Sequence, residues 1–375
     1  MRRIYADHNA TTPLDPDVLA AMLPYFANHY GNASSVHFFG REARAAVDDA
    51  RMRLARLLGA EESEIVFTSG GTESDNTVIF GVPAGHIITS AIEHHAVLHA
   101  CRARTDCEVT YLPVDGDGLV NPDDLRRAIR PNTRLVSIMS ANNETGTVQP
   151  VRELAAICRE YGVWFHTDAV QSFGKVPVNV REWGVDLLSL TAHKFYGPKG
   201  VGALFIRRGV KLRPLLYGGS HENERRAGTE NVAGIVGLAK AAELAVAKLE
   251  KESARLFQLT ERLATGITET ISGAHRNGHP RLRVPNTVNF SFEGCRFEGL
   301  LLGLDLEGVA VSSGSACAVG TLEPSHVLVA MGRSPALARG AVRYSLGAGN
   351  TDEDVEAIVA ATARVVARLR QLAPA

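Results

Sequence analysis

The sequence predicts an α/β fold, in which a wound, mostly parallel sheet carries helices on both faces and a smaller α+β layer follows. Between about residues 15 and 250, short β-rich runs alternate with amphipathic stretches of helical period. After residue 250 this alternation stops. We therefore expect a large domain over residues 15–250, a small domain over 251–375, and an N-terminal segment, 1–14, that packs with the small domain.

Short strands and one clear helix define the large domain. Residues 64–68 (EIVFT) predict a strand that ends at two glycines, and residues 72–80 open the following helix. Residues 134–140 (RLVSIMS) predict a buried strand. Apolar residues recur every three or four positions over 151–158, which predicts a helix, and residues 163–166 predict the next strand.

The small domain begins with a helix, marked by regularly spaced apolar residues over 256–267. Alternating apolar residues over 288–292 predict a half-exposed strand, and residues 309–311 predict another short strand. The last helix begins at Thr351, where Asp354 three positions later completes a helix-start signal. An apolar stripe along this helix predicts that one face packs against the small domain.

Charge and composition exclude several classes of protein. The 375 residues contain 40 Lys and Arg against 41 Asp and Glu, so neither a nucleic acid nor an anionic membrane is the expected partner. The N-terminus has no apolar stretch, and the most apolar region, 232–249, contains three charged residues. We therefore expect no membrane span, no secretory signal and a cytoplasmic location. Five cysteines without a C-x-x-C pair predict reduced thiols and no zinc site.

An anion site is predicted where the strand 64–68 gives way to a helix, in the sequence TSGGTESDN over residues 68–76. The two glycines allow the backbone N–H groups of Gly71 and Thr72 to approach a phosphate. The helix dipole and the Thr72 hydroxyl add to the attraction. Two glycines before a helix more often form only a tight turn, so this motif alone decides nothing.

Two further residues follow buried strands and complete a pattern. Asp168, in HTDAVQS, lies where ligands of open α/β sheets collect, and its carboxylate would pair well with a protonated pyridine nitrogen. Lys194, in TAHKFYGPKG, follows a later strand, and a partly desolvated lysine can form a Schiff base with an aldehyde. A phosphate turn, an aspartate and a lysine in this order predict a pyridoxal 5'-phosphate site.

Motifs along nearly the whole chain resemble those of the cysteine desulfurases of the NifS/IscS type, in the class V aminotransferase group. They include YADHNATTPLDP, GNASSVHFFGREA, IVFTSGGTESDN, EHHAVL, NNETGTVQP, DAVQS, TAHKFYGPKG, RRAGTENV, SSGSAC and VRYSLG. The resemblance implies the pyridoxal-phosphate-dependent transferase fold of type I, with a seven-stranded sheet in the large domain. It also implies a homodimer that converts L-cysteine to L-alanine.

The resemblance assigns roles around the cofactor ring. Lys194 matches the lysine that binds the cofactor covalently and then moves the substrate α-proton. Asp168 matches the partner of the pyridine nitrogen, and Gln171 matches the residue that hydrogen-bonds the ring hydroxyl. His94 matches an imidazole that stacks on the ring and acts as an acid or base.

It also assigns the groups that hold the cofactor phosphate and the substrate. The matching phosphate ligands are Gly71, Thr72, Thr191 and His193. Thr229, in RAGTEN, matches a ligand contributed by the other subunit of the dimer. Asn143 and Arg343 match the pair that binds the substrate carboxylate, and Asn143 is also expected close to the cofactor ring.

Cys317 distinguishes a sulfur transferase from other pyridoxal enzymes. It lies in SSGSACAVG, a run of small residues that predicts a mobile, accessible loop, whereas the remaining four cysteines read as buried small hydrophobes (Cys101, Cys107, Cys158 and Cys295). As a thiolate it could take the substrate sulfur as a persulfide and deliver it to an acceptor. By resemblance the acceptor is an iron-sulfur scaffold or a sulfur carrier protein, and the short stretch after Arg343 leaves the choice open.

Several alternatives stay open at the level of sequence. A selenocysteine lyase or a class V aminotransferase would share the cofactor residues, and a non-catalytic scaffold would share the fold. His95 and His99 are four positions apart beside Glu93, which suggests a metal, although solvated helix histidines are commoner. The run HENERR, residues 221–226, reads as a charged surface loop whose arginines could be structural.

Overall fold

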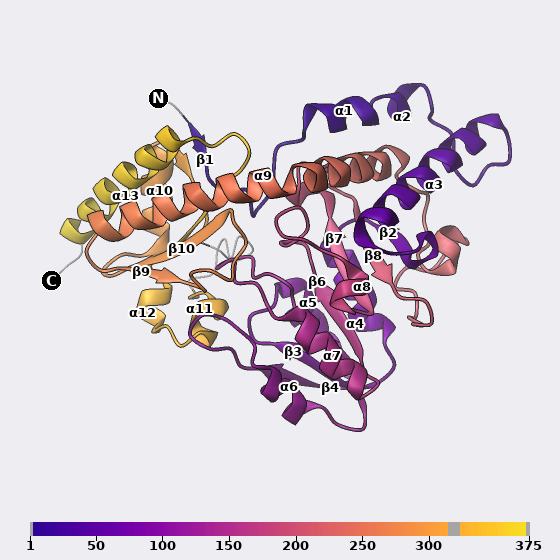
Figure 1. Ribbon diagram of the computed structural model, residues 1–375, viewed down its shortest axis with the longest axis horizontal. Coiled ribbons are helices and arrows are strands. Elements are labelled where there is room, and N and C mark those ends of the chain that lie inside the picture. Colours follow the sequence, from indigo (N-terminus) through magenta and orange to yellow (C-terminus); the bar gives the residue numbers. More distant parts are fainter. Residues whose placement is uncertain (1–2, 314–322, 373–375) are drawn as a thin grey trace.

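The computed structural model describes residues 3–313 and 323–372, and within them seven strands form the main sheet, in the order β2-β8-β7-β6-β5-β3-β4 (Figure 1). All neighbours in this sheet are parallel except that β8 runs antiparallel to β2 and β7. The bounds are β2 Ile65–Thr68, β3 Gly85–Ser90, β4 Cys107–Leu112, β5 Thr133–Ser137, β6 Trp164–Asp168, β7 Leu187–Thr191 and β8 Gly202–Ile206. The predicted α/β class and mostly parallel sheet are confirmed.

Helices cover both faces of this sheet. Successive residues of a strand point to opposite faces, so each face offers apolar side chains against which helices can pack. Leu188 of β7 and Phe205 of β8 join one apolar cluster with α3, α7 and α9, whereas Leu187 and Leu204 join another with α4 and α5. The helices of this half are α1 Pro16–Met22, α2 Pro24–Ala27, α3 Phe38–Leu58, α4 Gly71–Gly81, α5 His95–Ala103, α6 Pro122–Ala128, α7 Val151–Glu160 and α8 Val180–Trp183, with 3-10 turns η1 Glu62–Glu64, η2 Ala192–Lys194 and η3 His221–Glu224.

The second half is a three-stranded antiparallel sheet, within the described residues, in the order β12-β10-β9, and α9, α10 and α13 pack on one face of it (Figure 1). Its strands are β9 Ala274–Asn277, β10 Thr287–Phe292 and β12 Ala341–Ser345; its helices are α10 Phe297–Leu306, α11 His326–Ala330, α12 Pro335–Ala338 and α13 Asp352–Leu372. The start of α13 has the predicted exchange of hydrogen bonds between Thr351 and Asp354.

The two halves are joined by α9, Val232–Thr270, a helix of 39 residues that crosses the molecule (Figure 1). The predicted helix over 256–267 is only its second part, and the expected boundary at residue 250 lies inside it. The N-terminal strand β1, Ile4–Tyr5, pairs with β11, Val309–Ala310, and Ile4 enters the apolar core of the second half. The division into domains stays a prediction.

The expectations about the exposure of β10, of Cys107 and of the run at 221–226 are wrong. Strand β10 is buried along its whole length because Val288, Phe290 and Phe292 face the helices while its other face packs against neighbouring polar groups, including Asn277. Cys107 on β4 is half-buried, whereas the three other predicted hydrophobic cysteines are buried and free (Cys101, Cys158 and Cys295).

The run at 221–226 is not simply a surface loop, because Glu222 is buried and accepts two hydrogen bonds of 2.7 Å from Arg51. The same carboxylate accepts the Phe67 N–H at 3.0 Å, and the Arg51 guanidinium lies 4.7 Å from the centre of the Phe67 ring. This pair fixes the 221–226 segment against β2.

Among the described residues, no helix is long and apolar enough to cross a lipid bilayer.

Loss of this buried pair should destabilise the fold strongly. In Arg51→Met the Glu222 carboxylate stays buried without its partner, so we expect the free energy of unfolding to fall by about 3 to 5 kcal/mol. Denaturant unfolding measures it. The control is Arg126→Met, which removes an exposed pair with Glu160 and should change the free energy of unfolding little. Equal losses in both variants would contradict the structural role of Arg51.

Candidate active site

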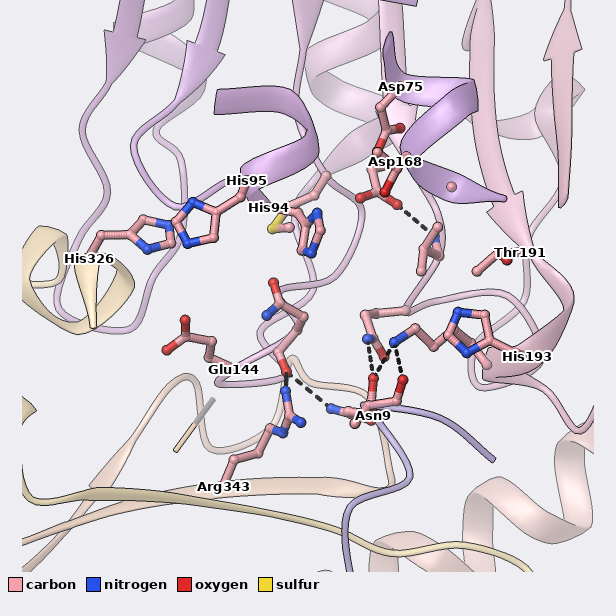
Figure 2. A pocket seen from close by; sticks show the side chains of 18 residues that line it. Asn9, Asp75, His94, His95, Glu144, Asp168, Thr191, His193, His326 and Arg343 are labelled. Atoms are coloured by element: carbon pink, nitrogen blue, oxygen red, sulfur yellow. Dashed lines mark hydrogen bonds between the residues drawn. The ribbon is translucent and has the colours of Figure 1, made fainter. Parts of the chain in front are cut away.

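A cavity of about 270 Å³ opens where the carboxyl ends of the parallel strands meet the N-terminal segment and the second half (Figure 2). Ends of parallel strands gather at one sheet edge, so residues far apart in sequence meet there. Ten of the twelve predicted site residues line this cavity: Gly71, Thr72, His94, Asn143, Asp168, Gln171, Thr191, His193, Lys194 and Arg343. Thr229 does not line it and is exposed, and Cys317 lies outside the described residues.

The N-terminus of α4 forms one end of the cavity. The helix's own bonding begins with the Ser74 N–H, which donates to the Gly70 carbonyl, so the N–H groups of the first turn are not used within the helix. Gly70 has φ +154°, a conformation that side chains rarely adopt, and a Cβ at Gly71 would lie 2.7 Å from Val170. Together with Thr72, Thr191 and His193 this turn suits a phosphate.

Asp168 lies at the end of β6 and is buried (Figure 2). Burial raises its pKa to about 6, although the Val170 N–H, which donates to its Oδ1 at 2.8 Å, and the charge of Lys194 oppose that rise. A cationic ring nitrogen beside this carboxylate would favour its ionised form. The position therefore suits the partner of a pyridinium.

Lys194 extends from η2 to the N-terminal segment. Its Nζ donates to the carbonyl oxygens of Asn9 at 2.5 Å and Ala10 at 2.8 Å, as the dashed lines in Figure 2 show. Both of these acceptors are backbone carbonyls of the N-terminal segment, and Lys194 lines the cavity. A lysine amine at this position suits reaction with an aldehyde.

His94 caps α5, and its ring faces into the cavity (Figure 2). Its Nδ1 accepts the Ala96 N–H at 3.1 Å, which places the proton of the neutral ring on Nε2. Burial, followed by the positive charges of Lys194 and the neighbouring histidines, lowers its pKa to about 4. The ring is therefore neutral near pH 7 and offers an Nε2–H donor.

Arg343, on β12, brings a cation from the second half to the cavity. Its Nη1 donates to the Asn143 carbonyl at 2.9 Å, and its Nη2 donates to Asp7 at 2.7 Å. The Arg343 side chain is only 2% exposed, and these contacts help to set the direction of its guanidinium. Arg343 and Asn143 thus lie together, as a carboxylate-binding pair requires.

Three acidic or basic residues of this region escaped the sequence reasoning, namely Asp75, Glu144 and Lys175, and Glu93 was considered only beside a possible metal site. Asp75 and Glu144 line the cavity, and Asp75 shares its buried corner with Asp168 (Figure 2). Their positions within the motifs SGGTESDN, EHHAVL, NNETGTVQP and the residues after DAVQS were the only available signal. Burial and then Asp168 raise the pKa of Asp75 well above its usual value.

His95, His99 and His326 lie together beside the cavity, with ring centres of neighbouring pairs 4.8 and 4.9 Å apart. Burial and then the charge of His326 lower the pKa of His95. Within the described part of the chain, no group of three or more histidine, cysteine or carboxylate residues is arranged to hold a metal ion.

Known proteins resemble this chain over its whole length. The family model described as aminotransferase class-V matches residues 4–358. The chain is 52% identical to cysteine desulfurase IscS of Dictyoglomus turgidum and 51% identical to that of Methanosarcina thermophila, covering 100% of this chain and 97% and 94% of those proteins. A solved NifS-like protein is 39% identical with a TM-score of 0.91, covering 98% of this chain and 100% of the other. A NifS-like protein from Rickettsia africae is 32% identical with a TM-score of 0.89, covering 97% and 99%.

Glu93 makes the stability of the fold depend on pH. Its buried carboxyl accepts from Ser90 Oγ at 2.5 Å and Met139 N at 3.0 Å, yet burial raises its pKa from 4.5 to about 8. Between these pH values the folded chain holds a proton that the unfolded chain has lost. The free energy of unfolding therefore falls as the pH rises through this window.

Glu93→Gln removes this titration and should gain stability relative to wild type as the pH rises from 5 to 8. The expected change is a few kcal/mol, since each unit of pKa shift corresponds to roughly 1.4 kcal/mol. Denaturant unfolding of both proteins across this range measures the difference. Glu160→Gln, at an exposed carboxylate, is the control. A difference between Glu93→Gln and wild type that does not vary with pH would show that Glu93 is already ionised at pH 5.

Proposed function

This chain belongs to the class-V aminotransferase family and is a cysteine desulfurase that uses pyridoxal 5'-phosphate, and we propose that Lys194, Asp168 and Cys317 carry its chemistry. The observation that supports these roles most is the convergence of ten predicted residues on one cavity. That cavity offers an anion-binding helix end, a buried carboxylate and an amine. These groups fit a phosphate, a pyridine nitrogen and an aldehyde respectively.

The cofactor would be held at both ends. Gly71, Thr72, Thr191 and His193 would bind its phosphate, and Asp168 would keep its ring nitrogen protonated. Bound in this way, pyridoxal 5'-phosphate supplies an electron sink for negative charge at the substrate α-carbon. Gln171 would donate a hydrogen bond to the ring oxygen. The substrate would bind on the side of the cavity where Asn143 lies.

The chain's own groups would then bind the substrate and move its proton. Arg343 and Asn143 orient L-cysteine by its carboxylate, and Lys194 Nζ takes the proton from the α-carbon. The neutral His94 ring presents an Nε2–H within the same cavity, where it can donate a hydrogen bond to a negatively charged group of the substrate or cofactor. Arg343 and Asp168 line the cavity and are buried, so little water reaches the groups at these positions.

Cys317 would receive the sulfur. Its thiolate attacks the substrate sulfur, the carbon–sulfur bond breaks as a sulfur–sulfur bond forms, and the carbon fragment takes up protons and leaves as L-alanine. The persulfide then passes to an acceptor such as an iron-sulfur scaffold or a sulfur carrier protein. A solved protein described as SspA in complex with cysteine, 38% identical over 92% of this chain with a TM-score of 0.81, supports cysteine as the substrate.

Cys317→Ala should keep the visible absorption of the bound cofactor but release almost no sulfide from L-cysteine in the presence of a reductant. We expect a loss of at least about 100-fold, since the nucleophile is removed. Cys107→Ala, at a half-buried thiol outside the cavity, is the matched control and should retain activity. Normal desulfuration by Cys317→Ala would instead favour a lyase, and activity that needs a keto acid would favour an aminotransferase.

We propose that two copies of the chain form a dimer, with Thr229 of each facing the cavity of the other. Thr229 is exposed, yet its segment is fixed beside the α4 end by the Arg226–Glu73 ion pair, 2.8 Å long. Large apolar residues over 26–39 are also exposed, including Tyr30 at 66% and Phe38 at 58%. Exposed apolar groups gathered in this way are typical of an interface.

The chain should sediment as a dimer at micromolar concentration, and Tyr30→Glu combined with Phe38→Glu should raise the monomer fraction at least tenfold. Charges buried at an interface lose their water without gaining partners. Sedimentation velocity across a concentration series measures the change. Leu302→Glu, at a residue of α10 that is 64% exposed, is the control and should leave association unchanged. A monomeric wild type would refute the dimer.

A further inference from the structure

Lys175 is a buried amine that no step above uses. It follows β6 by seven positions, is 8% exposed, and does not line the cavity that holds the predicted site residues. Its Nζ donates to Gln171 Oε1 at 2.7 Å and to Asn9 Oδ1 at 3.0 Å. It therefore contacts two residues of the cavity wall from behind.

The hydrogen bonds of Lys175 decide how the Gln171 amide is turned. An amide has an oxygen that accepts and a nitrogen that donates, and its orientation follows from its partners. Lysine only donates in these bonds, so the atom next to it is Oε1. The other end, Nε2, donates to the Asn9 carbonyl at 3.0 Å, and Asn9 lines the cavity. Gln171 lines the cavity and Lys175 does not, so the amide end turned away from Lys175 is Nε2, which has a second hydrogen to offer.

This orientation does not require Lys175 to be charged. Burial, and then the charges of Lys194 and Arg343, lower the pKa of Lys175 well below its usual value. His8 of the N-terminal segment also faces it, and Glu252 of α9 lines the second cavity, of about 360 Å³, that Lys175 borders. Both the ammonium and the neutral amine can donate two hydrogen bonds, so Gln171 Oε1 and Asn9 Oδ1 are satisfied in either state.

We propose that Lys175 is a positioning residue that holds Gln171 as a hydrogen-bond donor toward the ring oxygen next to the cofactor's aldehyde carbon. This inference rests on the cofactor roles proposed above for Gln171 and Lys194. A donor at that place stabilises the oxygen as an anion. If Lys175 is removed, the amide is free to turn and to present Oε1, which repels that anion.

The test is a pH titration of the visible absorption of the cofactor-loaded protein. The absorption change reports the proton shared between Lys194 Nζ and the ring oxygen. In Lys175→Met the oxygen loses its donor and holds this proton more tightly, so the midpoint should rise by about one pH unit. Gln171→Glu cannot donate from its carboxylate and should shift the midpoint in the same direction.

The double variant separates an action through Gln171 from a direct effect of charge. If Lys175 acts through Gln171, the combined shift equals the larger single shift; if it acts by charge alone, the two shifts add. Additive shifts, or an unmoved midpoint in Lys175→Met, overturn the proposal. Lys175→Arg keeps the donors and should titrate like wild type. Should Lys175→Met fail to fold, a Lys175→Arg shift as large as that of Gln171→Glu overturns it instead.

The same experiment distinguishes failure of this inference from failure of the proposed function. A wild-type chain that shows no visible absorption after incubation with pyridoxal 5'-phosphate contradicts the cofactor site, and the role of Lys175 with it. A normal wild-type band with an unmoved Lys175→Met titration refutes only the role of Lys175. Cofactor affinity of the unloaded protein, measured by equilibrium titration, supplies a readout that does not depend on turnover.

Discussion

The active site depends on the hydrogen bonds of one buried residue, Asn9. A buried asparagine must satisfy its backbone and its amide within the protein, and at 1% exposure this residue has little access to water. Its backbone and side-chain groups bond to Asn143, Gln171, Lys175, Lys194, Asn286, Thr287 and Ser345. These partners come from both halves of the molecule. One residue near the N-terminus therefore sets the position of Lys194 and Gln171 relative to the strand that carries Arg343.

Burial disfavours the charged forms of several side chains around the site, and a ligand of opposite charge would favour them again. Burial raises the pKa of Asp168 to about 6 and raises that of Asp75, whereas it lowers that of Lys175. Each shift means that the protein alone disfavours the charged form. A cationic ring nitrogen beside Asp168 would favour the ionised carboxylate. An anionic ring oxygen beside Gln171 would favour the charged form of Lys175 behind it. Perturbed groups of this kind are typical of functional sites, and here Asp168 and Asp75 line one cavity while Lys175 contacts its wall from behind.

The sequence predicted the residues at the strand ends better than those that connect the two halves. The strand and helix periodicity was sufficient to predict the α/β class and the places of Asp168 and Lys194, because these follow local patterns. Asn9 and Lys175 have no such pattern, since their importance arises from contacts between segments more than 150 positions apart. Burial of Glu222 was missed for the same reason: its partner Arg51 is 171 positions away. The charge of a side chain predicts exposure only when no distant partner compensates it.

The described residues on either side of 314–322 are hydrogen-bonded to residues at the end of the cavity where Arg343 and Asn143 lie. Before this segment, Ser312 exchanges backbone hydrogen bonds with Arg343. After it, the Ser325 hydroxyl donates to the Glu144 carboxylate at 2.5 Å, and Glu144 follows Asn143 directly in the chain. Burial raises the pKa of Glu144 to about 7, so both of its protonation states are accessible near neutrality. Arg343 thus holds Ser312, and Glu144 holds Ser325, at the end of the cavity where we propose that the substrate carboxylate binds. The described residues that flank 314–322 therefore depend on the same contacts as the proposed substrate site.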